Sequence, residues 1–339
     1  MSLDRIRLAS LHDKVISAEE ASAFIEDGMT VGMSGFTRAG EAKAVPLALV
    51  KRAHTNPLKI TLITGASLGN DLDKQLTEAG VLARRLPFQV DNTLRKAINN
   101  GEVMFIDQHL SETVEQMRNL QLKKPDVAII EAVAITEDGG IIPTTSVGNS
   151  ASFAIFAEKV IVEINTNLSP AFEGLHDIYI PTYRPTRQPI PLTQVDERIG
   201  THAINIDPAK IVGIVINNDL HDSPSTVTAP DDETQGIADH LIAFFEKEVA
   251  EERLPKNLGP LQAGIGSIAN AVLTGLKDSN FEDLVMYSEV LQDCTFELID
   301  AGKMKFASGS SITLSAKYGE KVFNNLEAYK DKLVLRPQE

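Results

Sequence analysis

Short β-branched apolar segments alternate with segments of helical spacing between residues 17 and 216 of this chain. The apolar segments predict strands over residues 30–36, 58–64, 103–107, 127–131, 160–164 and 211–216. The intervening segments predict helices over residues 17–28, 46–54, 93–99, 112–120 and 151–158. Because strands that alternate with helices form parallel sheets covered by those helices, the sequence predicts an α/β fold.

This alternation stops at residues 168–200, which contain five prolines and few periodic apolar residues. We expect an extended surface loop, or an arm that covers a partner. Residues 218–230 are polar and contain two prolines, as is typical of a linker. The sequence therefore predicts a first domain over 1–217, a linker over 218–230 and a second domain over 231–339. A long amphipathic helix is expected to begin the second domain.

The formal net charge of −15 disfavours nucleic acid and anionic membrane surfaces as partners, and no local basic patch offsets it. The longest aliphatic run covers residues 211–216, far short of the ~20 residues that a membrane span needs. Asp4, Arg5 and Arg7 at the N-terminus are unlike a secretory signal. We expect a soluble protein of the cytoplasm, or of the mitochondrial matrix in a eukaryote.

The single cysteine, Cys294, excludes an intrachain disulfide. Its position on the apolar face of a predicted helix favours a buried small hydrophobe over a nucleophile, since no histidine is near it in sequence. The seven histidines lack H-x-x-x-H spacing, so no metal site is predicted. The sequence also lacks the G-x-S-x-G and G-x-x-x-x-G-K motifs.

One glutamate has an unusual neighbourhood. A short apolar run ends at Tyr287, and helical spacing follows from Leu291 to Ala301, with Gly302 after it. Glu289 lies where the strand pattern changes directly into the helix pattern. Ligands bind at the carboxyl ends of parallel strands, so Glu289 is a candidate site residue. A helix-capping or solvated glutamate is an equally good interpretation of the position alone.

A second candidate is the loop Gly264-Ile265-Gly266, which precedes a predicted helix over residues 268–276. Free backbone amides at a helix N-terminus bind anions and stabilise oxyanions. With Ala269, the loop also matches the dinucleotide fingerprint G-x-G-x-x-A. That match is weak because residues 257–261 contain Pro and Gly instead of a buried aliphatic strand. A tight structural turn is a third interpretation.

Together, the loop and Glu289 suggest acyl transfer. Consecutive strand–helix units in one sheet would bring both to the same sheet edge. A glutamate, with a pKa of about 4.3, is ionised at neutral pH and needs no general base. It can attack a thioester to form a mixed anhydride, and the released thiolate can then form a glutamyl thioester. One amide directed at the oxyanion is typically worth ~3 kcal/mol.

Four motifs resemble the class I CoA-transferases, in the branch that includes acetyl-CoA hydrolase and succinyl-CoA:acetate CoA-transferase. The first is residues 31–37 with Gly40, Lys43, Val45 and Pro46, and the second is residues 87–91 with Leu94, Arg95 and residues 97–99. The others are residues 262–271, similar to the CoA-binding loop, and residues 286–293, similar to the segment of the catalytic glutamate. At Val90 the family often carries a small hydroxyl residue.

The resemblance implies two related α/β domains of the NagB/RpiA-like type, with the active site between them, and usually a homodimer. It implies Glu289 as the nucleophile, the amide of Ile265 as an oxyanion donor, and Ser67 in the acyl pocket. The residues implied in CoA binding are Leu261, Gln262, Ala263, Gly264, Ile265, Gly266 and Asn270. The substrates would be an acyl-CoA and a carboxylate, without a prosthetic group or metal.

Members of that family continue beyond the point matching Glu339, with a Gly-Gly-Ser-Gly-Asp segment that supplies a second backbone donor. We therefore expect an incomplete second domain and weak activity of this chain alone. Three rival hypotheses stay open: an acetyl-CoA hydrolase, a dinucleotide-dependent oxidoreductase with Glu289 on a ribose, and a non-catalytic CoA-binding or oligomerising fragment.

Overall fold

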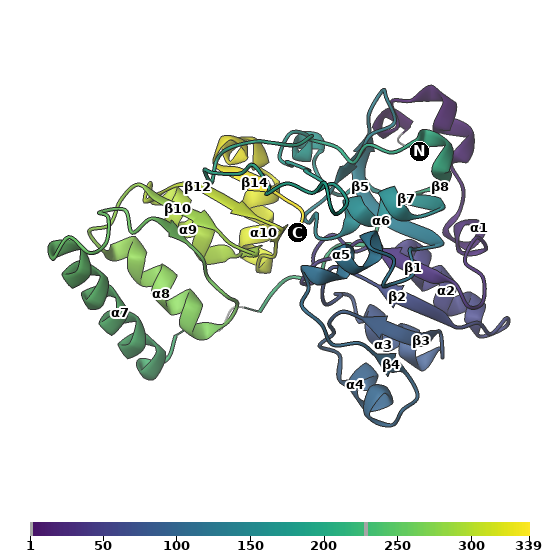
Figure 1. Cartoon of the computed structure of the whole chain (residues 1–339), viewed down its shortest axis with the longest axis horizontal. Coiled ribbons are helices and arrows are strands. Elements are labelled where there is room, and N and C mark those ends of the chain that lie inside the picture. The colour runs from purple at the N-terminus through teal and green to yellow at the C-terminus, as the bar shows by residue number, and fades with distance from the viewer. Residues whose placement is uncertain (1–2, 227–229) are drawn as a thin grey trace. The chain divides into compact units, whose positions relative to one another are not determined.

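The computed structural model describes residues 3–226 and 230–339 and divides into two compact units (Figure 1). The first unit comprises the residues up to 190, residues 200–223 and residues 336–339. The second comprises residues 191–199 and 224–335. Residues 227–229 of the predicted linker lie outside the described residues. The domain boundaries at 217 and 231 stay a prediction.

The first unit is built on a sheet with the strand order β4-β3-β2-β1-β5-β7-β8, and β6 pairs with β5. All neighbours are parallel except β5 and β6, so the predicted parallel α/β fold is confirmed. The strands are β1 Thr30–Met33, β2 Ile60–Ile63, β3 Leu82–Leu86, β4 Met104–Phe105, β5 Val127–Ile135, β6 Ile141–Pro143, β7 Lys159–Asn165 and β8 Ile211–Asn217.

Helix α1 precedes the first strand of this unit, and each of the helices α2 to α6 follows a strand. The helices are α1 Ala18–Ser22, α2 Ala44–Ala53, α3 Leu72–Glu78, α4 Asn92–Asn99, α5 Glu112–Arg118 and α6 Ser150–Phe156, with 3₁₀ turns at Leu3–Arg5, Ala9–Lys14, Pro170–Phe172 and Pro208–Lys210. A capping box begins α1, since Ser17 and Glu20 exchange hydrogen bonds there, close to the predicted helix start at residue 17. The helix ends at Ser22, however, and not at Gly28.

The pair α3 and β3 is absent from the predicted elements. Asp73 of α3 and Arg85 of β3 are both buried, and they form an ion pair with Arg85 Nε 2.8 Å from Asp73 Oδ1. Their polar side chains interrupt the apolar periodicity of both segments, which hides them from a reading based on hydrophobic pattern. The pairing is a tertiary contact, so periodicity alone does not reveal it.

Strand β5 forms the centre of the first unit. All nine of its residues are buried, as expected for a parallel strand covered on both faces. A turn at Gly139 and Gly140 connects β5 to β6, and Gly139 takes a φ of 85° that few other residues adopt. Residues 168–200, all of them described, contain one 3₁₀ turn and no α-helix or strand.

The second unit has a parallel sheet of order β14-β12-β10-β9 and a separate parallel pair, β11 and β13. The strands are β9 Pro260–Leu261, β10 Leu284–Tyr287, β11 Val290–Leu291, β12 Met304–Gly309, β13 Ser311–Ile312 and β14 Leu333–Leu335. The helices are α7 Asp232–Ala250, α8 Ser267–Asp278, α9 Asp293–Asp300 and α10 Ala316–Phe323, with 3₁₀ turns at Leu326–Ala328 and Lys330–Lys332.

Helices α7 and α8 lie side by side in this unit (Figure 1). Asp231 caps α7 by accepting a hydrogen bond from the amide of Thr234, and Asp232 and Glu233 follow in the first turn. Acidic residues at these positions stabilise the N-terminal end of the long helix expected to begin the second domain.

Candidate active site

Glu289 lies between two short strands, after β10 and before β11. The predicted direct passage from strand to helix is wrong, since α9 begins only at Asp293. Val290 and Leu291 are in extended conformation instead, because they pair in parallel register with Ser311 and Ile312 of β13. This register comes from a segment about 20 residues away in sequence, which the local apolar spacing does not reveal.

The backbone around Glu289 is held by the segment that follows β12. The carbonyl oxygen of Glu289 accepts hydrogen bonds from the amides of Ser310 at 2.8 Å and Ser311 at 3.3 Å. The amide of Ser288 donates to the carbonyl oxygen of Ser308 at 2.8 Å. The backbone of Glu289 is therefore fixed, although its side chain is exposed.

The carboxylate of Glu289 has no hydrogen bond or ion pair with any residue that the structure describes. Partial burial raises its pKa above the ordinary value. Glu289 does not cap the following helix, because the N-cap of α9 is Gln292. The position thus provides an unpartnered carboxylate on a fixed backbone, as a nucleophile requires.

The glycine loop and Glu289 follow neighbouring parallel strands. Leu261 of β9 pairs with Met286 of β10, so residues 262–266 and Glu289 both follow the carboxyl end of a strand. The hydroxyl group of Ser288 joins the two segments, since it donates to the carbonyl oxygen of Ala263 at 2.9 Å. The predicted adjacency of the two segments in one sheet is confirmed.

The glycine loop offers unused hydrogen-bond donors. The amides of Gly264, Ile265 and Gly266 donate to no acceptor in the described part of the chain. Gly266 is the N-cap of α8 and has a φ of 134°, which favours glycine. The side chain of Ile265 is 64% exposed. Such amides at the start of a twelve-residue helix can stabilise an anion or an oxyanion.

The other residues of the predicted CoA site lie on the same loop and helix. Leu261 and Ala263 are partly buried, and Gln262 is exposed. Asn270 faces α9, where its Oδ1 atom lies 3.6 Å from the Sγ atom of Cys294. Cys294 is buried, as predicted, and burial raises the pKa of its thiol to about 12. The roles of these residues in binding CoA stay a prediction.

An apolar cavity of about 580 Å³ lies against the loop, on the side of α7 and α8. Its lining residues are Leu241, Phe245, residues 261–269, Val272, Leu273 and Leu276. Glu289 is absent from this lining. The dinucleotide motif gains no support, because β9 has only two residues and begins with Pro260.

Ser67 belongs to the first unit, in the loop that follows β2. It is buried, and its carbonyl oxygen accepts a hydrogen bond from the amide of Arg38 at 3.1 Å. Its predicted place in an acyl pocket stays a prediction. Val90 lines a separate polar cavity of about 240 Å³ in the same unit, together with Arg38, Asn70 and Ser223.

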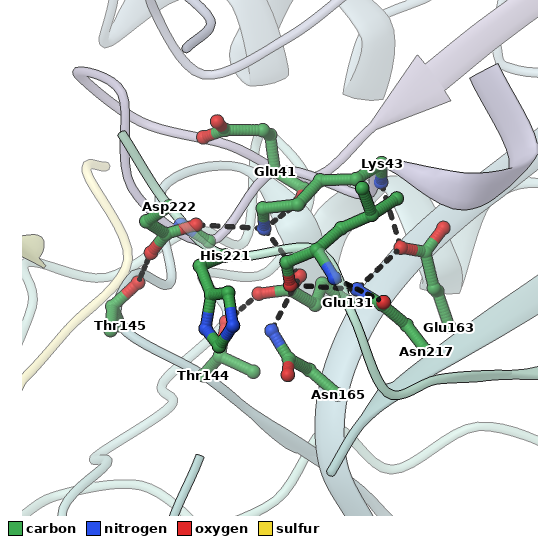
Figure 2. A network of polar contacts seen from close by, with 12 residues as sticks. Glu41, Lys43, Glu131, Thr144, Thr145, Glu163, Asn165, Asn217, His221 and Asp222 are labelled. Carbon is green, nitrogen blue, oxygen red and sulfur yellow. Dashed lines mark hydrogen bonds and ion pairs between the residues drawn. The ribbon is translucent and has the colours of Figure 1, made fainter. Parts of the chain in front are cut away.

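The sequence interpretation missed a buried charge cluster in the first unit (Figure 2). The ammonium group of Lys43 lies 2.5 Å from Glu131 Oε2 and 2.7 Å from Asp222 Oδ1. Glu41 and Glu163 are buried beside it. One sequence feature could have revealed this cluster, namely a glutamate within each of the apolar strands β5 and β7. Glu131 and Glu163 are paired in register on these strands.

Among the described residues, no group of three or more His, Cys, Asp or Glu side chains is arranged to hold a metal ion. No helix in the described part of the chain combines the length and apolarity needed to cross a membrane.

Residues 2–216 match the model of the acetyl-CoA hydrolase/transferase N-terminal domain. The chain belongs to this family. A succinyl-CoA:acetate CoA-transferase from Clostridium kluyveri is 44% identical over 337 residues, which are 99% of this chain and 62% of the relative. An acetyl-CoA hydrolase from Schizosaccharomyces pombe is 43% identical over 345 residues, covering 98% of this chain and 66% of that protein. The chain thus spans a little under two thirds of these family members.

Solved structures support the same family fold. RipA from Yersinia pestis aligns with a TM-score of 0.71 at 17% identity, over 97% of this chain and 69% of RipA. A 4-hydroxybutyrate CoA-transferase from Porphyromonas gingivalis aligns with a TM-score of 0.61 at 18% identity, over 97% of this chain and 68% of that one. At such low identity, these alignments show the fold alone.

Proposed function

We propose that this protein transfers CoA between a short-chain acyl-CoA and a carboxylate of the acetate or succinate type, through Glu289. The observation that carries the proposal is the unpartnered Glu289 carboxylate on a strand end next to a loop with free amides. The similarity to a succinyl-CoA:acetate CoA-transferase along 99% of this chain supports it.

In the proposed reaction, the Glu289 carboxylate attacks the thioester carbonyl carbon and releases the CoA thiolate. The product is a mixed anhydride between Glu289 and the acyl group. The thiolate then attacks the Glu289 carbonyl carbon, which releases the donor carboxylate and leaves a glutamyl-CoA thioester. An acceptor carboxylate repeats these steps in reverse. Because one thioester replaces another, the exchange needs no ATP, and the amide of Ile265 would stabilise the oxyanion.

Acetyl-CoA hydrolysis is the second candidate, supported by the 43% identity to an acetyl-CoA hydrolase. The first half of the reaction would be identical, with water in place of the acceptor carboxylate. Exclusion of water from the closed site would favour transfer over hydrolysis. Measuring free CoA release with and without added acetate or succinate distinguishes the two activities.

Trapping the covalent intermediate tests the proposal. The protein is incubated with acetyl-CoA, treated with borohydride or hydroxylamine, and digested for mass spectrometry. We expect modification at Glu289, none in Glu289→Gln, and unchanged modification in Glu282→Gln, which alters another exposed glutamate of the second unit. Modification elsewhere, or none despite CoA binding, would refute Glu289 as the nucleophile and favour a non-catalytic CoA-binding protein.

We further propose a cytoplasmic homodimer without a prosthetic group. The resemblance to the class I CoA-transferases supports the dimer, and the acidic composition argues against nucleic acid as a partner. Light scattering coupled to gel filtration tests the oligomeric state, and a mass near 36.8 kDa would contradict the dimer.

A further inference from the structure

The buried charge cluster of the first unit contains more acids than one lysine can balance. Its charged members are Glu41 and Lys43 before α2, Glu131 on β5, Glu163 on β7 and Asp222 after β8 (Figure 2). Four of them are at most 1% exposed, and the side chain of Asp222 is 20% exposed. If all were ionised, the cluster would hold four negative charges against one positive charge. His221, next to Asp222, is exposed.

Three of the four acids have enough donors to remain ionised. Glu163 accepts hydrogen bonds from the first backbone amides at the start of α2, at 2.8, 2.9 and 3.1 Å. Glu131 accepts from Lys43, from the Thr144 hydroxyl group at 2.7 Å and from the side chain of Asn165 at 3.2 Å. Such charge-assisted bonds stabilise a carboxylate.

Asp222 also has contacts that stabilise its ionised carboxylate. Its Oδ2 atom accepts from the Thr145 hydroxyl group at 2.6 Å and from the amide of Gly40 at 3.1 Å. Its Oδ1 atom pairs with Lys43. These contacts hold the segment after β8 against the loops that follow β1 and β6.

Glu41 is the exception. Lys43 donates to Glu131 and to the backbone carbonyl oxygen of Glu41 and forms an ion pair with Asp222, but it makes no hydrogen bond or ion pair with the Glu41 carboxyl group in the described structure. Asn70 donates to Glu41 Oε1 at 2.9 Å. The Oε2 atom is buried and has no partner among the described residues. An unpaired buried carboxylate is strongly disfavoured, whereas the neutral acid tolerates this environment.

We propose that Glu41 carries a proton in the folded protein at slightly acidic pH, and that loss of this proton above pH 7 loosens the segment that contains Asp222. Burial, together with the charge of Asp222, raises the pKa of Glu41 to about 7. Burial also raises the pKa of Glu131, whereas its ion pair with Lys43 opposes this rise. We place the proton on Glu41 because the ammonium group and two further donors already neutralise Glu131.

The consequence follows from the neighbours of Glu41. An ionised Glu41 repels Asp222, whose contacts to Lys43, Thr145 and Gly40 hold the segment after β8. Glu41 also holds Asn70, which donates to the carbonyl oxygen of His221 at 3.0 Å and whose amide donates to Ser223 Oγ at 3.1 Å. Asn70 and Ser223 line the polar cavity of 240 Å³, so the proton would control one wall of that cavity.

The folded state should become less stable as the pH rises through the pKa of Glu41. The folded pKa of Glu41 lies above its ordinary value of 4.5, so the folded state binds the proton more tightly. Protonated Glu41 stabilises the folded state fully below pH 4.5. This stabilisation falls as the pH rises towards 7 and is lost above pH 7. In this window the unfolding equilibrium constant of the first unit should rise by up to about tenfold per pH unit.

The experiment compares the wild type with Glu41→Gln and Glu131→Gln. Glutamine has the shape of a neutral glutamic acid, so Glu41→Gln should fold and lose the pH dependence. Glu131→Gln should lower the free energy of unfolding at every pH, because Lys43 and Asn165 lose a charged partner. Infrared spectroscopy should detect the carbonyl band of a protonated carboxyl group in the wild type at pH 6. That band should disappear by pH 9 and be absent from Glu41→Gln.

Two results would overturn the proposal. One is a wild-type protein without the protonated carboxyl band at pH 6, and the other is a Glu41→Gln variant that keeps the band and the pH dependence. Hydrogen exchange of the Gly40 amide, which donates to Asp222, tests whether loss of the Glu41 proton loosens the Asp222 segment. After correction for the intrinsic rate, exchange should accelerate above pH 7 in the wild type only. Equal behaviour of Glu41→Gln would exclude control of the Asp222 segment.

Discussion

Ser288 and Ala263 exchange two hydrogen bonds, since Ser288 Oγ donates to the carbonyl oxygen of Ala263 at 2.9 Å and accepts from its amide at 3.4 Å. This exchange ties the residue before Glu289 to the glycine loop. Gln292 adds a second tie, because its Nε2 atom donates to the carbonyl oxygen of Gly264 at 3.2 Å. The position of the loop relative to the strand end that carries Glu289 is therefore set by contacts within one unit.

Replacing Ser288 by alanine should weaken this tie. We expect a loss of about 1 kcal/mol in the free energy of unfolding, typical of one or two net hydrogen bonds. Under the proposed function, labelling of Glu289 by acetyl-CoA should slow by about tenfold, because the oxyanion donors are less well positioned. Urea denaturation and the labelling rate are the measurements. An unchanged labelling rate in a destabilised variant would show that the tie is only structural.

The pH dependence of the proposed reaction should reflect Glu289. Partial burial raises the pKa of its carboxyl group, and only the ionised form is a nucleophile. The rate of covalent labelling should therefore fall as the pH decreases, with a midpoint above the ordinary value of 4.5. Glu289→Gln should reduce the rate by at least about 10³-fold at every pH. A pH-independent rate between pH 4 and 7 would contradict this assignment.

The buried pair of Arg85 and Asp73 should stabilise the first unit only as a pair. Arg85→Met leaves a buried carboxylate without its ionic partner, at a cost of about 3–5 kcal/mol. The double variant Arg85→Met/Asp73→Leu should recover most of this loss, since no buried charge is left. A double-mutant cycle by chemical denaturation measures the coupling. Additive losses would mean that the two residues act independently.

Two glycines of the second unit should respond to alanine in opposite ways. A Cβ atom at Gly309 would lie 2.8 Å from Leu291 Cγ, so Gly309→Ala should cost about 1–3 kcal/mol. A Cβ atom at Gly236, within α7, meets nothing within 4 Å. Gly236→Ala should add about 0.5–1 kcal/mol through helix propensity. Thermal unfolding of both variants distinguishes the two effects, and equal shifts would disprove the close contact at Gly309.

Cys294 should be unreactive in the native protein. Burial raises the pKa of its thiol to about 12, so almost no thiolate exists at pH 8. A disulfide reagent such as dithiobis-nitrobenzoate should react slowly with the folded protein and rapidly with one thiol in denaturant. Fast reaction in the native state would show that α9 opens readily or that Cys294 is accessible.

Local sequence pattern determined the elements that depend on few neighbours. The alternation of apolar and helical segments predicted the parallel sheet of the first unit, and Ser17 and Asp231 marked helix starts through contacts three residues away. It also predicted that Glu289 and the glycine loop follow adjacent strands, because consecutive strand–helix units place their carboxyl ends at one sheet edge.

Tertiary structure alone decided the features that join distant segments. The pairing of β11 with β13 keeps the residues directly after Glu289 extended, and the Arg85–Asp73 ion pair joins a strand and a helix whose segments lack clear periodicity. The same is true of Glu41, because the nearby Lys43 pairs with Glu131 of β5 and with Asp222 after β8 instead. Hydrophobic periodicity reports which face of an element is buried, whereas ion pairs and register depend on which elements meet, and only the folded chain specifies that.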